Sequence, residues 1–257
     1  MRFAGLSLLC CSVLLISSQG AQADPLVDIV RAAVPFGRLD SHASIAAAVA
    51  RRMTDLQRYT LDAAKSLSAR EQAVAFRMDG SVLWMIEGTR RGVAIPADKD
   101  VYLHRAESRL IFVHTHPSGG SFSSRDLAQL AKPGVAVIVV LGHDGSVYIA
   151  GRGPRFDGAR IERALYSAAQ AGIAMRLRQE QPARVSLRTV DPHVEHLAAT
   201  ALGNTGVIEY STLLSQRRES IYRTCGGLCG RLTKAAARRI NQVVDTLKPP
   251  RGLKENR

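Results

Sequence analysis

Short apolar runs separated by tight turns are the feature that most restricts the fold of this chain. Residues 73–78 (AVAFRM) and 81–86 (SVLWMI) flank Asp79-Gly80, and residues 135–141 (VAVIVVL) form the most strand-like stretch of the sequence. An Asp-Gly pair between two such runs is a strong signal for a β-hairpin. The middle of the chain is therefore predicted to contain a sheet.

Two further patterns extend this prediction. Residues 109–114 (RLIFVH) resemble a buried strand, and a Ser/Gly/Pro loop leads from them into a short helix over about 124–131, which Pro133-Gly134 ends. Asp144-Gly145 predicts a second hairpin, with residues 146–150 as its returning strand. Helical spacing of apolar residues predicts helices over residues 25–68, 157–182, 192–202, 211–222 and 231–247.

The first residues have the pattern of a secretory signal peptide. Arg2 gives a short positive region, residues 4–18 are apolar, and Ala21-Gln22-Ala23 supplies small residues for cleavage. An uncleaved membrane anchor is the alternative, but the apolar run is shorter than the roughly 20 residues that span a bilayer. We therefore expect a periplasmic or secreted protein that begins near Asp24 and has no transmembrane segment in the mature chain.

These patterns divide the chain into five parts. The predicted fold class of the chain is α/β, with a mixed sheet core, flanking helices and a basic helical C-terminal extension. The predicted parts are a signal peptide (1–23), an N-terminal helical segment (24–69), a core domain that contains the sheet (70–152), a helical C-terminal region (153–248) and a disordered tail (249–257).

Positive charge is concentrated in the C-terminal part. The formal net charge is +13, and from Gly151 onward there are 19 Lys and Arg against 9 Asp and Glu. A soluble basic face, an anionic envelope polymer or protein partner, and nucleic acid are all compatible with such a surface. Export argues against nucleic acid as the partner of this surface. Among specific partners, an anionic envelope polymer or a protein is therefore preferred.

Signal-peptide cleavage would leave two cysteines in an oxidising compartment. Cys225-Gly-Gly-Leu-Cys229 predicts a small disulfide loop, because its glycines permit a tight turn. Two free thiols on one helix face are the alternative. His193 and His196, one helical turn apart, are expected on a solvated helix face.

A pair of histidines at the end of a predicted strand indicates a metal site. Because residues i and i+2 of a strand point to the same face, His114 and His116 can approach one ion. Pro117 ends the strand, and Asp126 near a helix N-terminus can add an oxygen ligand. Two His and one carboxylate leave a fourth tetrahedral position for water, as expected of a catalytic zinc site.

Two further residues suggest hydrolytic chemistry. Glu87 follows a largely apolar run, where a carboxylate is costly unless it is paired or functional, so it is predicted to be the general base. Ser123 is predicted to donate a hydrogen bond to the oxyanion of a tetrahedral intermediate. Its spacing to Asp126 also matches a helix N-capping pattern, and the two roles are compatible.

Glu87, His114-Thr-His116-Pro117 and Ser123-Ser-Arg-Asp126 together resemble the motif of the JAMM zinc metallopeptidases of the MPN fold, in their bacterial RadC-like branch. The resemblance covers residues 70–152. It implies zinc bound by His114, His116 and Asp126. It also implies Glu87 as general base and Ser123 as oxyanion donor. Nine residues separate His116 from Asp126, one fewer than in the family, which leaves open whether Ser123 or Ser124 faces the site.

The expected function is therefore an exported zinc-dependent metallopeptidase or isopeptidase. Its substrate would be a protein or a peptide, with peptidoglycan peptides among the envelope candidates. The alternatives are a non-catalytic MPN-type binding or scaffold protein and a RadC-like nucleic-acid-associated protein. The completeness of the ligand set argues against the scaffold, and the signal peptide argues against the nucleic-acid role.

Overall fold

The computed structural model describes residues 51, 54–55, 70–180, 190 and 193–246. The predictions of a signal peptide over 1–23 and of a tail over 249–257 lie outside the described residues. The same holds for nearly all of the predicted N-terminal helical segment. None of the described helices is long and apolar enough to cross a membrane.

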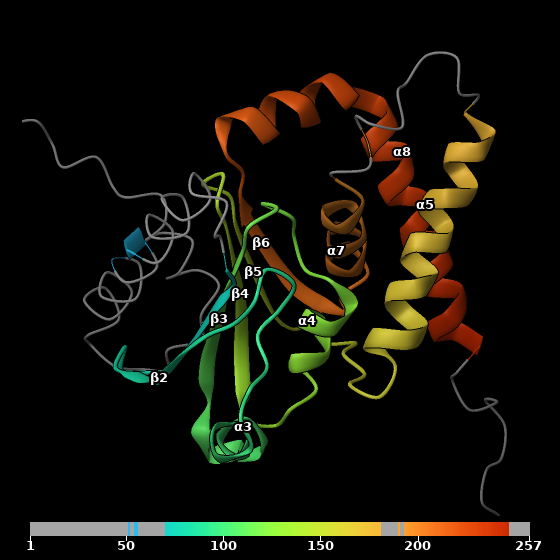
Figure 1. Ribbon diagram of the computed structural model, residues 1–257. Coiled ribbons are helices and arrows are strands. Elements are labelled where there is room, and N and C mark those ends of the chain that lie inside the picture. Colours follow the sequence, from blue (N-terminus) through green and yellow to red (C-terminus); the bar gives the residue numbers. More distant parts are fainter. Residues whose placement is uncertain (1–50, 52–53, 56–69, 181–189, 191–192, 247–257) are drawn as a thin grey trace, which may run out of the picture.

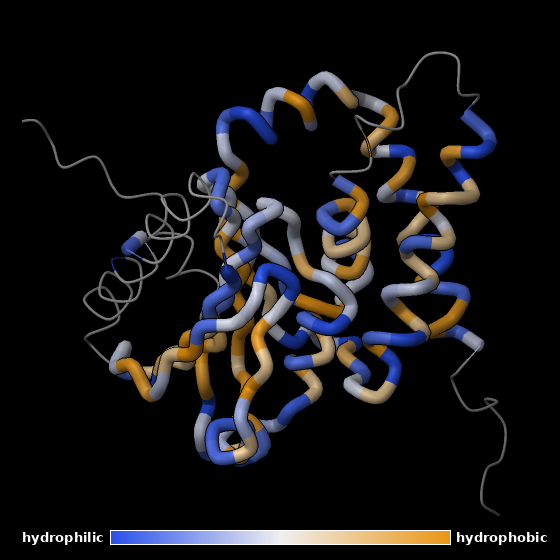
Figure 2. Tube along the Cα trace, in the orientation of Figure 1, coloured by the Kyte–Doolittle hydropathy of each residue, from blue (hydrophilic) through white to orange (hydrophobic). Residues whose placement is uncertain are grey.

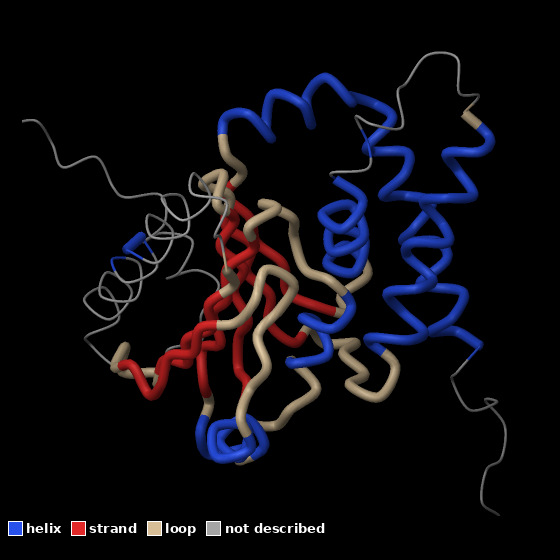
Figure 3. The backbone as a smooth tube through the Cα atoms, viewed as in Figure 1, coloured by secondary structure: helices blue, strands red, loops and turns tan. Residues whose placement is uncertain are grey.

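A six-stranded mixed sheet forms the centre of the molecule (Figures 1 and 3). Its spatial order is β2-β1-β3-β4-β5-β6, and β3 with β4 is the one parallel pair. The strands are β1 (Gln72–Phe76), β2 (Val82–Glu87), β3 (Leu110–His116), β4 (Val135–Gly142), β5 (Val147–Arg152) and β6 (Ile208–Leu213). The predicted α/β class is confirmed, and the MPN-type fold stays a prediction.

Both predicted hairpins are present. The Asp79-Gly80 turn joins β1 to β2, and the Asp144-Gly145 turn joins β4 to β5. Gly80 and Gly145 have φ values of +84° and +91°, the left-handed region that glycine adopts without steric cost. The Asp-Gly pairs therefore fold as their chemistry predicts.

The parallel pair results from a crossover through α4 (Ser124–Gln129). Helix α3 (Ala97–His104) and the short 3-10 segment η1 (Ala106–Ser108) connect β2 to β3. Strand β3 extends to His116, two residues beyond the predicted end. Both histidines therefore lie on the strand, at its carboxyl end.

Helices cover the sheet face that carries the main apolar cluster. They are η2, a π-helical segment (Ile161–Tyr166), α5 (Ser167–Gln179), α7 (Val194–Asn204) and α8 (Gln216–Thr246). Phe112, Ile138 and Tyr148 of the sheet and Leu165 and Leu197 of the helices belong to the same buried cluster. In Figure 2 hydrophobic residues run along the strands, and the helices beside the sheet alternate between hydrophobic and hydrophilic residues.

The C-terminal region differs from its predicted form in two ways. Residues 208–213 form strand β6, paired with β5, although a helix was predicted from 211 onward. Because β6 supplies backbone partners to the outer edge of β5, tertiary pairing overrides the local helical pattern. Helix α8 is one element where two helices with a turn were predicted, and it bends along its course (Figure 1). Glycine pairs such as Gly226-Gly227 are a usual cause of such bends.

Cys225 and Cys229 are buried in α8, and both are free thiols. They lie on consecutive turns of a continuous helix, so the small glycine loop that the disulfide prediction required is not formed. The alternative, two thiols on one helix face, describes this structure.

Candidate metal centre

His114, His116 and Asp126 converge at the carboxyl end of β3. The two Nε2 atoms lie 3.1 Å apart. The Asp126 carboxylate places Oδ1 at 3.0 Å from Nε2 of His114 and Oδ2 at 3.4 Å from Nε2 of His116. The residues are buried or partly buried, and their ligand atoms lie within 4.8 Å of one another. The structure therefore brings together all three residues that the sequence predicts as metal ligands.

These separations suit one tetrahedral ion. Zinc–nitrogen and zinc–oxygen bonds near 2.0–2.1 Å require ligand atoms about 3.3 Å apart. The closest contact of each pair in this group, between 3.0 and 3.4 Å, is near that separation, with Oδ1 of Asp126 toward His114 and Oδ2 toward His116. A group of two imidazoles and one carboxylate thus fits a divalent metal ion, and the identity of the metal stays a prediction.

The start of α4 holds Asp126 rigidly. Ser123 is the N-cap, and its hydroxyl accepts a hydrogen bond from the Asp126 amide at 3.3 Å. In return the Asp126 carboxylate accepts the Ser123 amide at 2.6 Å. This is a capping box, which satisfies two amides at the helix N-terminus. The capping role of Ser123 is present, while both Ser123 and Ser124 line the cavity of the site.

The charges of the site perturb its titratable groups. Burial acts to raise the pKa of Asp126, but the positive charge and hydrogen bond of His114 and the contact with His116 hold that pKa well below its usual value. Burial acts to lower the pKa of His116, and the hydrogen bond and charge of Asp126 raise it instead, with smaller contributions from Glu71 and Glu195. The carboxylate is therefore held in its ionised form, the form that coordinates metal.

The alternation of side chains along the strands places Glu87 outside this site. The register pairs Ala73 with His114 and Gln72 with Glu87. Directly paired residues of antiparallel strands share a face, and neighbours along a strand point to opposite faces. Glu87 therefore lies on the other face of the sheet from His114. Its side chain is 49% exposed and forms an ion pair with Arg70 at 3.0 Å.

Glu71 takes the position predicted for Glu87. Continuing the β1–β3 register brings Glu71 beside His116, and a hydrogen bond from the Gln72 amide to the Thr115 hydroxyl fixes the strands there. Glu71 lines the same cavity as the three candidate ligands. Burial raises its pKa, against the lowering effect of His116 and His114. The signal for this residue in the sequence is a carboxylate two residues before the apolar run that begins at Ala73.

The cavity has a volume of about 570 Å³ and also contains residues from distant parts of the chain. Glu195 from the first turn of α7 reaches its wall, and burial raises the pKa of this carboxyl group. An added Cβ on Gly120 would lie 2.6 Å from Oε2 of Glu195, so the Glu195 carboxylate lies directly against the loop that follows His116. Glu195 was not expected at this site, because the residues beyond 152 were predicted to form a separate extension.

Comparisons of the chain with protein-family models, with curated proteins and with solved structures give no match.

Proposed function

We propose that this chain is a zinc-dependent hydrolase of peptide or isopeptide bonds. The observation that carries the proposal is the convergence of His114, His116 and Asp126 in one cavity that also contains the partly buried Glu71. The motif that resembles the JAMM metallopeptidases supports it, with Glu71 in place of Glu87 as general base.

The chemistry that zinc would supply here is the activation of water, whose pKa it lowers to about 7. Glu71 accepts the proton of the attacking water and returns it to the leaving amine. Its raised pKa favours proton uptake during the reaction. The Ser123 hydroxyl accepts the Asp126 amide and keeps its own hydrogen, which it can donate to the developing oxyanion.

The substrate class proposed is a protein or peptide, including peptides of the cell envelope. Export, predicted from residues 1–23, would place the activity outside the cytoplasm. An anionic envelope or protein partner for the basic C-terminal region stays a prediction.

Metal content tests the site directly. The purified wild-type protein is expected to contain about one zinc ion per chain, and His116→Ala, which removes one ligand, is expected to lose most of it. Inductively coupled plasma mass spectrometry measures both. Equal zinc in the two proteins, or none in either, would show that the proposed ligand set is wrong.

Glu71→Gln and Glu87→Gln form a matched pair that tests the general base. Glu71→Gln is expected to keep zinc and lose hydrolysis by about 10²–10⁴-fold, because the amide cannot accept the proton. Glu87→Gln is expected to retain activity, since its side chain lies on the other face. A proteomic and muropeptide comparison of cells that express each variant identifies the substrate and measures its turnover. Loss of turnover in Glu87→Gln alone would reverse the assignment.

A further inference from the structure

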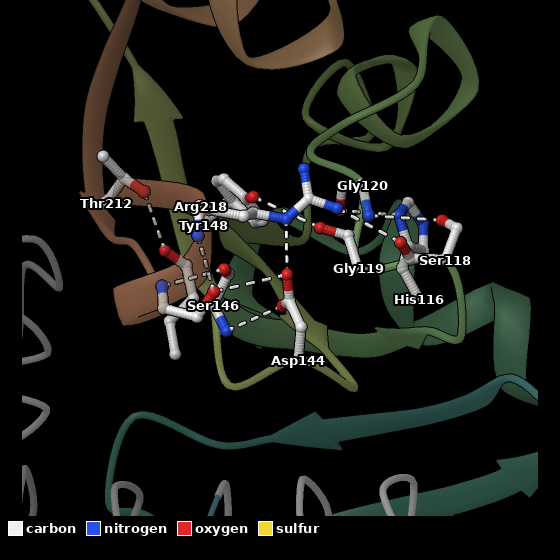
Figure 4. A network of polar contacts seen from close by, with 11 residues as sticks. His116, Ser118, Gly119, Gly120, Asp144, Ser146, Tyr148, Thr212 and Arg218 are labelled. Carbon is white, nitrogen blue, oxygen red and sulfur yellow. Dashed lines mark hydrogen bonds and ion pairs between the residues drawn. The ribbon is translucent and has the colours of Figure 1, made fainter. Parts of the chain in front are cut away.

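The loop after His116 is held in place by a residue from the C-terminal helix. Arg218 of α8 is 8% exposed. Its Nε donates to Oδ2 of Asp144 at 2.5 Å, and its Nη2 donates to the carbonyl of Ser118 at 3.1 Å. Figure 4 shows the guanidinium group between the β4–β5 turn, which carries Asp144, and the loop 118–120. One side chain thus joins two segments that border the metal centre.

Other contacts close the same loop. The Tyr148 hydroxyl donates to the Gly119 carbonyl at 3.2 Å, and the Gly119 amide donates to the His116 carbonyl at 2.9 Å. Gly119 has φ +69°, and an added Cβ there would lie 2.8 Å from Cγ of Asp144 and 2.9 Å from Nη2 of Arg218. The loop is therefore packed directly on the Asp144–Arg218 pair.

The end of this loop orients a candidate ligand. Nδ1 of His116 lies 3.1 Å from the carbonyl oxygen of Gly120. Because a carbonyl can only accept, Nδ1 carries a proton in this contact, which leaves Nε2 as the ring nitrogen that can bind a metal ion. Nε2 is the atom that faces His114 and Asp126. A hydrogen bond of this kind fixes the ring orientation and tautomer of a metal-binding histidine.

We propose that Arg218 is a positioning residue of the metal centre. Paired with Asp144, it holds residues 118–120 so that the Gly120 carbonyl keeps His116 with Nε2 toward the metal. The inference rests on the proposed zinc site. It makes the C-terminal region, predicted as an extension, a working part of that site.

Zinc affinity is the first readout, measured by competition with a chromophoric chelator on the full chain. Arg218→Met removes both donors and is expected to weaken zinc binding about 10–100-fold, the effect of losing an outer-shell partner. The neighbouring Arg217 is exposed, whereas Arg218 is buried. Arg217→Met is the matched control and is expected to bind zinc as the wild type does.

Arg218→Lys separates the loss of the positioning contacts from a loss of folding. Removal of the arginine leaves the Asp144 carboxylate without its charged partner, which is costly, and an unfolded Arg218→Met protein would lose zinc for that reason alone. Lysine keeps the charge for Asp144 but lacks the planar fork that reaches two acceptors at once. It is expected to keep the thermal unfolding midpoint close to that of the wild type and still weaken zinc binding.

The protonation of His116 is the second readout. Nitrogen-15 NMR of histidine-labelled protein is expected to show Nδ1–H in the wild type and a mixture of tautomers in Arg218→Lys. A folded Arg218→Lys with wild-type zinc affinity and the wild-type tautomer would overturn the positioning role and leave the zinc site standing. A wild type that binds no zinc would overturn both proposals.

Discussion

His196 lies inside the core, although its spacing to His193 suggested a solvated helix face. Its Nδ1 is 2.8 Å from the Tyr210 hydroxyl, which lies 3.2 Å from the Ser121 hydroxyl. Burial lowers the pKa of His196 to about 4, with help from the charges of His193 and Arg218. A neutral histidine is therefore part of the folded core at ordinary pH.

This lowered pKa predicts a loss of stability in acid. Between pH 6.5 and about 4 the unfolded chain binds a proton at His196 and the folded chain does not, so the free energy of unfolding falls as pH falls through this window. The shift corresponds to about 3 kcal/mol at its full extent. Urea unfolding of the wild type and of His196→Gln across this range measures it. An equally steep pH dependence in His196→Gln would contradict the assignment to His196.

At the scale of elements, α5 and α8 approach closely at Gly172. A Cβ added there would lie 2.8 Å from the carbonyl oxygen of Ala235 and 2.8 Å from Cα of Ala236. Both are backbone atoms of α8, which cannot move aside as a flexible side chain does. The small residue therefore sets the distance between the two helices.

Two glycine-to-alanine substitutions separate packing from helix propensity. Gly172→Ala is expected to destabilise the protein by about 1–3 kcal/mol, because the steric cost exceeds the gain in helix propensity. Gly230→Ala, also in a helix, has no neighbouring atom within 4 Å of the added Cβ. It is expected to stabilise by about 0.5–1 kcal/mol. Thermal unfolding compares the two, and a stabilised Gly172→Ala would show that the helices adjust without cost.

At the scale of the whole molecule, the sheet and the C-terminal helices share one core. Strand β6 pairs along the length of β5, and Tyr148 and Ala150 of β5 pack in the same cluster as Leu197 and Ile173 of the helices. Residues 70–152 are thus covered by segments that follow them in the chain.

A chain that ends at Arg152 is therefore expected not to fold. It would expose the outer edge of β5 and the apolar face that α5, α7 and α8 cover, which favours aggregation. Circular dichroism during thermal unfolding measures this, with the full chain as control. A soluble, monomeric fragment with a cooperative transition would instead support the division at residue 152 that the sequence suggested.

The sequence by itself determined the local features of this protein. Apolar runs and Asp-Gly turns predicted five of the six strands and both hairpins, since these depend on neighbours in the chain. The spacing of His114 and His116 and the capping pattern before Asp126 likewise predicted the candidate ligands, because each ligand is oriented by its own strand or helix.

Only the tertiary structure decided which distant residues lie beside the candidate ligands. A shift of one residue in register turns a side chain to the other face, so pairing with β3 brings Glu71 to the histidines and leaves Glu87 outside. The same holds for β6, Glu195 and Arg218, whose positions depend on packing against segments far away in the chain. Local chemistry thus specified the candidate metal ligands, and long-range pairing specified the groups that surround them.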